Sequence, residues 1–203
     1  SCRPQPSWKP RETWRFLRGS LERARSAAVR RAAAAQLLVR RLELVETLAP
    51  AGLLDLYGRG WGPGGVLPGT WPERLGRALA GKRVEPCADK LEVLAGYRFA
   101  LCIENTSYPG YLTEKLIDAM AAGCVPLYQG APDIERLVPR EAYIDLRGLP
   151  PAALLDRMRR MGEVEAKRII GAGRAYLAGP EGRLHFQDAF AADVERRLVS
   201  SEG

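Results

Sequence analysis

Apolar and polar positions along the chain predict strands and helices in alternation. Short apolar runs predict strands at 53–57, 98–103, 125–128 and 142–146. Apolar positions spaced by threes and fours predict helices at 12–35, 36–48, 71–80, 89–94, 150–161, 163–178 and 187–199, a helix that begins at Thr113, and a helical turn at 133–137. Strands and helices that alternate with short connections are typical of parallel sheets. We therefore expect an α/β fold with a Rossmann-like, doubly wound parallel sheet.

The segment 95–132 joins a predicted strand, a polar loop, a helix and a second strand. Its polar and aromatic side chains gather where the first strand ends and the helix begins: Glu104, Asn105, Tyr108, Tyr111, Thr113, Glu114 and Lys115. The second strand stops at Gly130. In such strand–helix–strand units, ligands bind at the carboxyl ends of the strands. The sequence therefore predicts a binding site at this edge of the sheet.

Each polar residue in this segment has an ordinary explanation as well as a functional one. Lys115 in the first helical turn is either an exposed lysine or the ligand of an anion, which would offset its unfavourable position on the helix dipole. Glu114 is favoured at a helix start, and its carboxylate can also accept two hydroxyl groups of a ribose. Asn105 suits a turn or the edge of a sugar or phosphate. Tyr111 is either core filler or a platform for a ligand.

These motifs together resemble glycosyltransferase family 10, the α1,3/4-fucosyltransferases. The resemblance covers roughly residues 36–200, is strongest over 90–146, and rests on several short blocks in the right order: Arg41-x-x-Leu44-Val45-x-x-Leu48, Leu54–Gly58, Lys90-Leu91, Tyr97-Arg98-Phe99, Glu104-Asn105-Thr106, Tyr111–Lys115, Ile117–Gly123 and Pro126–Gly130. Several blocks in a fixed order are far more specific than any single one.

The resemblance implies the C-terminal, donor-binding half of a GT-B fold and inverting transfer of fucose from GDP-fucose to a glycan acceptor. It implies that Lys115 and Arg41 bind the donor's diphosphate, with Arg40 as the alternative to Arg41 if the register differs. It assigns Asn105, Tyr111 and Glu114 to the donor, and Glu104 to the same site, where we expect it to orient the loop. The chain has no Asp-x-Asp pair, and the family's site uses cations and a helix start instead, so we expect no metal and no other cofactor.

We expect two parts in the chain: a basic N-terminal arm at 1–35 and a nucleotide-sugar-binding domain at 36–203. The forty residues before Arg41 are too few and too rich in Arg and Ala to build an acceptor-binding domain. We therefore assign no catalytic base, and expect a donor half, a truncated member or a diverged one. Two alternatives stay open: a non-catalytic module that binds a nucleotide sugar, and another GT-B transferase such as an exostosin-like enzyme.

The charge of the chain limits the binding partners that we expect, and its cysteine content limits the compartment. The 203 residues carry a formal net charge of +7, and residues 1–50 alone hold 11 Lys/Arg and four Asp/Glu. A solvated helix or contact with an anionic membrane explains this arm; nucleic acid is not expected, because no aromatic and basic platform accompanies it. Four cysteines without Cys-x-x-Cys spacing, of which Cys102 and Cys124 read as small buried hydrophobes, favour a reducing compartment. We expect a cytoplasmic location, or the Golgi for a eukaryotic member.

Overall fold

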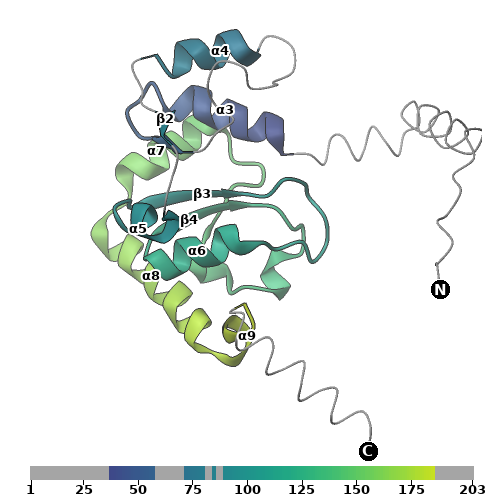
Figure 1. The fold of residues 1–203 in the computed structure, drawn as a ribbon. Coiled ribbons are helices and arrows are strands. Elements are labelled where there is room, and N and C mark those ends of the chain that lie inside the picture. The colour runs from purple at the N-terminus through teal and green to yellow at the C-terminus, as the bar shows by residue number, and fades with distance from the viewer. Residues whose placement is uncertain (1–36, 58–70, 81–83, 86–88, 186–203) are drawn as a thin grey trace, which may run out of the picture. The chain divides into compact units, whose positions relative to one another are not determined.

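The computed structural model describes residues 37–57, 71–80, 84–85 and 89–185 (Figure 1). Its elements are, in chain order, α3 (Leu38–Leu48), β1 (Leu56–Tyr57), α4 (Trp71–Ala78), β2 (Val84–Glu85), α5 (Lys90–Ala95), β3 (Phe99–Ile103), α6 (Glu114–Ala122), β4 (Val125–Gln129), η1 (Ile134–Arg136), η2 (Arg140–Ala142), β5 (Ile144–Asp145), α7 (Pro151–Arg160), α8 (Glu163–Ala178) and α9 (Pro180–Arg183). The predicted helices at 12–35 and 187–199, and the predicted arm at 1–35, lie outside the described residues, and the boundary between the two parts stays a prediction.

The strands form two parallel sheets. One contains β3, β4 and β5 in that order, with β4 in the centre and both neighbours parallel to it. The other is the short parallel pair of β1 and β2. Because β3, β4 and β5 are parallel, their carboxyl ends lie at one edge of the sheet, where the polar residues that follow β3 also lie.

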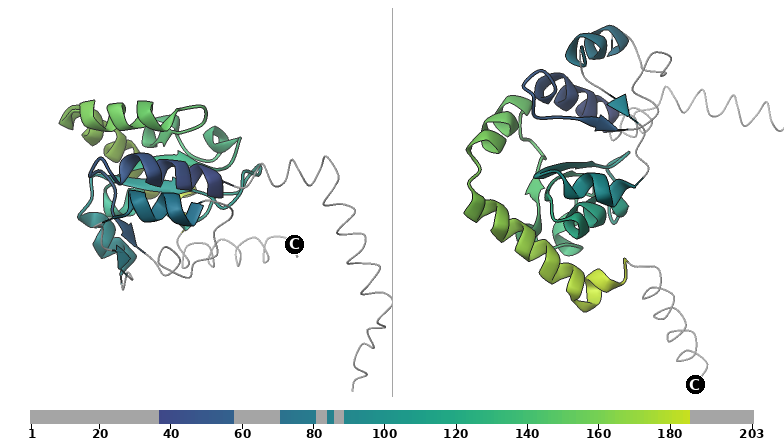
Figure 2. Two further views of the ribbon diagram at one scale, coloured as in Figure 1. Left: turned by 90° about the horizontal axis from the view of Figure 1, so that it is seen from above. Right: turned by 60° about the vertical axis from the view of Figure 1, so that its left-hand side comes forward.

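Helices cover both faces of the three-stranded sheet (Figures 1 and 2). Alternate residues of β3 and β4, among them Cys102 and Tyr128, pack with α6 and the C-terminal part of α8. The residues between them, among them Ile103 and Leu127, pack with α3 and α7. Side chains of successive strand residues point to opposite faces, so each strand serves two cores. The predicted α/β fold with a parallel sheet is confirmed.

The sequence of α6 fixes both ends of that helix. Thr113 has an extended backbone at the N-cap, and Gly123 ends the helix in the left-handed conformation with φ of +81°. Glycine adopts that conformation at little cost, and the N–H of Cys124 then closes the helix end on the carbonyl of Ala119 at 2.9 Å. Leu116 and Met120 are buried against the sheet. The first turn of α6 is thereby held beside the carboxyl end of β3.

The structure corrects several predicted boundaries. The strand predicted at 53–57 is only Leu56–Tyr57, because the N–H of Leu53 bonds to the carbonyl of Leu48 and belongs to the turn that ends α3. The strand predicted at 142–146 is Ile144–Asp145, because Ala142 belongs to the short helix η2. The elements β2, η2 and α9 were not predicted; each has four residues or fewer and is too short for a periodic signal.

Cys102 and Cys124 are free thiols buried in the core, as predicted. Among the helices of the described residues, none combines the length and the apolar character needed to cross a bilayer.

Candidate functional site

Three segments meet at the carboxyl end of β3. The loop that begins with Glu104 follows the strand, Lys115 comes from the first turn of α6, and Arg41 comes from the first turn of α3. The backbone joins two of these segments directly, because the N–H of Leu37 donates to the carbonyl oxygen of Asn105 at 3.2 Å. Residues that are 60 or more positions apart in the sequence thus form one polar cluster at the predicted edge of the sheet.

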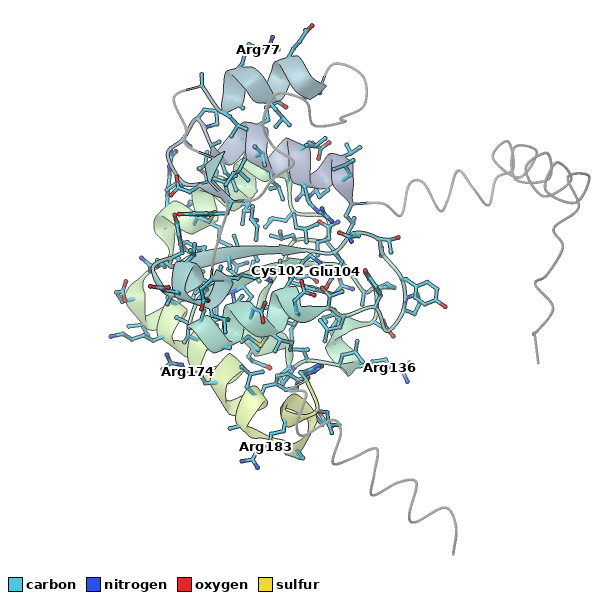
Figure 3. The ribbon with its side chains drawn as sticks, viewed as in Figure 1. Arg77, Cys102, Glu104, Arg136, Arg174 and Arg183 are labelled. Atoms are coloured by element: carbon cyan, nitrogen blue, oxygen red, sulfur yellow. The ribbon has the colours of Figure 1, made fainter. Side chains whose placement is uncertain are left out.

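Glu104 is the buried centre of this cluster, with no exposed surface. It lies between the end of β3 and α6 (Figure 3). Its Oε1 accepts hydrogen bonds from the backbone N–H and the hydroxyl of Thr113, each at 2.9 Å. Its Oε2 accepts from the same hydroxyl at 2.8 Å and from Lys115 Nζ at 3.1 Å. Glu104 is therefore saturated by protein groups and orients the loop and the helix start, rather than presenting its carboxylate to a ligand.

Lys115 is held on one side by protein and is open on the other. Besides Glu104, its Nζ donates to the Thr113 hydroxyl at 3.0 Å. The Lys115 side chain keeps 26% of its surface exposed, and Glu114 Oε1 lies 4.0 Å from its Nζ, beyond hydrogen-bond distance. One N–H of the ammonium group therefore remains available to an anion at the start of α6, where the helix dipole also favours negative charge.

Arg41 reaches the same edge from the opposite side of β3. Its Nη2 donates to the carbonyl oxygen of Glu104 at 2.9 Å and to Asn105 Oδ1 at 2.5 Å. Its Nε is buried without a hydrogen-bond partner among the described residues. Burial lowers the pKa of the Arg41 guanidinium, while Glu104 and Tyr111 act in the opposite direction. A guanidinium remains charged at neutral pH despite such a shift, so Arg41 is the second fixed cation of the site.

The neighbouring Arg40 has a different task. Its Nε donates to Gln129 Oε1 at 3.2 Å, and its Nη2 donates to the carbonyl oxygen of Leu149. The Arg40 side chain, which is only 15% exposed, thus ties α3 to the end of β4 and to the turn before α7. Of the two arginines that the sequence left open, Arg41 is the one beside Asn105.

The loop between β3 and α6 is fastened at several points. The hydroxyl of Ser107 donates to the carbonyl oxygen of Gly130 at 2.9 Å, and the N–H of Gly110, whose φ is +74°, donates to Asp133 Oδ1 at 2.8 Å. The N–H of Tyr111 donates to the carbonyl oxygen of Tyr108 at 3.1 Å. In this loop Tyr111 is half-buried and Tyr108 is exposed.

Glu114 lies beside Lys115 but faces outward, with 63% of its side chain exposed. Lys90 Nζ lies 3.7 Å from Glu114 Oε1 and 2.7 Å from Asp118 Oδ2. Partial burial raises the pKa of Glu114, but its own backbone N–H, Lys115 and Lys90 outweigh this effect, so the pKa lies below its usual value. The carboxylate is therefore ionised at neutral pH and accessible to a ligand. The sequence analysis named Lys90 only as part of the Lys90-Leu91 block and did not predict that it lies beside Glu114.

Gly130 was predicted only as the end of a strand, yet it shapes the site. A Cβ atom at this position would lie 2.4 Å from Glu104 Cγ and 2.4 Å from Tyr128 Oη. Real Cβ atoms do not approach other atoms so closely, so glycine leaves the space that the buried Glu104 occupies.

The site thus contains two fixed cations, a helix start, an exposed carboxylate and an amide at the end of a strand. Within the described part of the chain, there is no group of three or more His, Cys, Asp or Glu side chains arranged to hold a metal ion.

Comparison with known proteins shows to which family the chain belongs. The model of glycosyltransferase family 10 (fucosyltransferase), C-terminal region, matches residues 23–167, which is more than half of the chain. Human α-(1,3)-fucosyltransferase 4 is 37% identical over 106 residues, which are 50% of this chain and 16% of the human protein. The Helicobacter pylori α-(1,3)-fucosyltransferase FucT is 38% identical over 58 residues, 29% of this chain and 12% of that protein. GDP-fucose protein O-fucosyltransferase 3 of Danio rerio is 36% identical over 75 residues, 36% of this chain and 16% of that protein.

Among solved structures, an α1,3-fucosyltransferase with GDP-fucose aligns with a TM-score of 0.40 and 26% identity, over 42% of this chain and 26% of that one. The chain spans less than a fifth of the length of each of the three relatives described above. The match to the family model covers the strand, loop and helix that build the site. The chain belongs to glycosyltransferase family 10, the fucosyltransferases, and represents the C-terminal region of that family.

Proposed function

We propose that this region binds GDP-fucose and is the donor-binding part of an enzyme that transfers fucose, with inversion, to a glycan acceptor. The observation that carries the proposal is the convergence of Lys115 and Arg41 at the end of β3 from two different helices. Fucose as the transferred sugar is supported by the family name and by relatives that are named fucosyltransferases. GDP-fucose appears in the name of the Danio rerio relative.

The chemical problem in this reaction is the departure of GDP. Negative charge grows on the β-phosphate as the bond to the sugar breaks, and fixed donors aimed at that charge lower the barrier. The free N–H of Lys115, the guanidinium of Arg41 and the first N–H groups of α6 are donors of this kind, and protein contacts already hold the two cations in place. Preorganised cations stabilise the leaving group without reorganisation at the moment of reaction.

The other residues fit the remainder of the donor. Asn105 uses its Oδ1 for Arg41, which leaves its amide N–H groups to donate to a phosphate or sugar oxygen. Tyr111, half-buried near Arg41, offers a ring face and a hydroxyl. Glu114, ionised and exposed, is suited to accept two hydroxyl hydrogen bonds from the ribose. Glu104 acts through other residues.

Replacement of Glu114 by alanine is expected to weaken the binding of GDP more than that of inorganic pyrophosphate, because the proposed partner of Glu114 is the ribose. A hydrogen bond to a charged group contributes about 1.5–3 kcal/mol, so GDP affinity should fall by at least about tenfold. Calorimetric titration of both ligands measures the difference. Equal losses for GDP and pyrophosphate would show that Glu114 does not contact the nucleoside. Glu163→Ala, an exposed glutamate paired with Arg98, is the matched control and should change neither affinity.

Calorimetry with GDP-fucose, GDP, UDP and guanosine tests the proposed function itself. We expect binding of GDP-fucose and GDP, much weaker binding of guanosine because it lacks the diphosphate, and discrimination against UDP. Equal or tighter binding of UDP would instead favour another GT-B transferase. The glycan acceptor and the peripheral membrane contact through residues 1–35 stay predictions, and neither depends on the residues of this site.

A further inference from the structure

We infer that Glu104 is a positioning residue for the proposed donor site: it holds the Lys115 ammonium where a diphosphate can take its remaining N–H. The inference rests on the proposed function, since it concerns how Lys115 meets the phosphate. It assigns Glu104 no contact with the donor. The juxtaposition that supports it is a buried carboxylate with all its partners in the first turn of α6 and at its N-cap.

The three side chains form a closed network. Thr113 donates its one hydroxyl proton to Glu104 and accepts from Lys115 Nζ at 3.0 Å, so the hydroxyl links the carboxylate and the ammonium. Two of the three N–H groups of Lys115 are therefore used inside the protein, on Glu104 and Thr113. A flexible lysine becomes a cation with one fixed direction, because both bonds must be kept while the third N–H binds the ligand.

The surroundings of Glu104 prevent the carboxylate from following Lys115 outward. Its side chain has no exposed surface, and a Cβ at Gly130 would lie only 2.4 Å from Glu104 Cγ, so glycine at position 130 leaves the room that this side chain needs. The N–H of Glu104 also pairs with the carbonyl oxygen of Gln129 at 2.9 Å, which continues the ladder between β3 and β4. The anchor of Lys115 thus belongs to the rigid sheet, while Lys115 itself belongs to the helix start.

A purely structural role makes a different prediction from a positioning role. If Glu104 only ties the loop to α6, its replacement disturbs the whole site, whether or not Lys115 is present. If Glu104 acts through Lys115, its replacement has no further effect on GDP once Lys115 is gone. The two roles are separated by a double-mutant cycle on ligand affinity.

The experiment compares wild type, Glu104→Gln, Lys115→Met and the double variant by calorimetry with GDP and with guanosine. Glutamine keeps the volume and the acceptor for the Thr113 N–H but removes the negative charge that holds the ammonium. We expect Glu104→Gln to weaken GDP binding about tenfold in the wild-type background and less than about twofold in the Lys115→Met background. The affinity for guanosine should change in neither background. Glu163→Gln, a surface glutamate paired with Arg98, is the control and should match wild type.

Two Thr113 variants keep the test decisive if Glu104→Gln does not fold. Thr113→Val removes the hydroxyl between Glu104 and Lys115 with little change in volume, and Thr113→Ser restores it. We expect the valine variant to weaken GDP and the serine variant to retain wild-type affinity, with circular dichroism confirming that both are folded.

Three outcomes would overturn the inference: an equal loss of GDP affinity in both Lys115 backgrounds, no loss in either, or tighter binding by Glu104→Gln, which would mean that the carboxylate competes with the phosphate. Failure of the proposed function is distinguishable, because in that case the wild-type chain itself does not bind GDP and Lys115→Met changes nothing.

Discussion

Replacement of Lys115 by methionine is expected to lower the affinity for GDP by about a hundredfold, or about 2.7 kcal/mol. Methionine keeps the length and apolar contacts of the lysine stem but removes the ammonium. The substitution has two effects: the proposed hydrogen bond between the ammonium and the diphosphate disappears, and the fully buried Glu104 loses its cationic partner. The first effect weakens GDP binding, and the second lowers the free energy of unfolding, so the two quantities must be measured separately.

Calorimetry with GDP and urea unfolding separate these two effects. Lys167→Met removes an exposed cation from α8, and as a control it should leave both GDP affinity and the free energy of unfolding nearly unchanged. If Lys115→Met remained folded and bound GDP as tightly as wild type, Lys115 would have no role in binding the diphosphate.

Replacement of Gly130 by alanine is expected to reduce the free energy of unfolding by about 1–3 kcal/mol, the usual cost of overpacking a core. The added Cβ would lie 2.4 Å from both Glu104 Cγ and Tyr128 Oη. Neither neighbour can retreat easily, because Glu104 is held by its hydrogen bonds to Thr113, and the Tyr128 hydroxyl accepts the N–H of Ala131 at 3.0 Å. We therefore also expect weaker GDP binding, through displacement of Glu104 and with it Lys115.

Gly171→Ala is the matched control for Gly130→Ala. Gly171 lies in the exposed part of α8, and a Cβ there meets no atom within 4 Å. Alanine in a helix is favoured over glycine, so this variant should be more stable by about 0.5–1 kcal/mol. Urea unfolding of both variants measures the contrast. A Gly130→Ala protein as stable as wild type would show that the core at the end of β4 yields to the extra methyl group.

The central strand–helix–strand unit was predictable from local signals. The apolar runs predicted β3 and β4 to within one residue, and the predicted helix start at Thr113 lies one residue before α6. The sequence analysis did not predict the end of α6 at Gly123. Short elements such as β2 and β5 were missed or overextended, since two paired residues carry no periodicity and depend on contacts with distant strands.

The candidate site was predictable as a set of residues but not as a geometry. Alternation along β3 places Glu104 on the same side as Ala100 and Cys102, toward α6, so its burial follows from the strand pattern. The sequence could not show which of Arg40 and Arg41 lies at the site, because adjacent helix positions differ only in the distant carbonyl groups that they contact. The assignment of Lys115, Arg41, Asn105, Tyr111 and Glu114 to a donor stays a proposal.

We propose that protein cations, and not a metal ion, neutralise the diphosphate of the donor. The most direct measurement is a calorimetric titration of the metal-free chain with GDP in excess EDTA, repeated with millimolar Mg²⁺ or Mn²⁺. We predict the same dissociation constant in all three conditions, because Lys115 and Arg41 are already fixed at the end of β3. Binding that disappears in EDTA and returns with the metal would contradict the account.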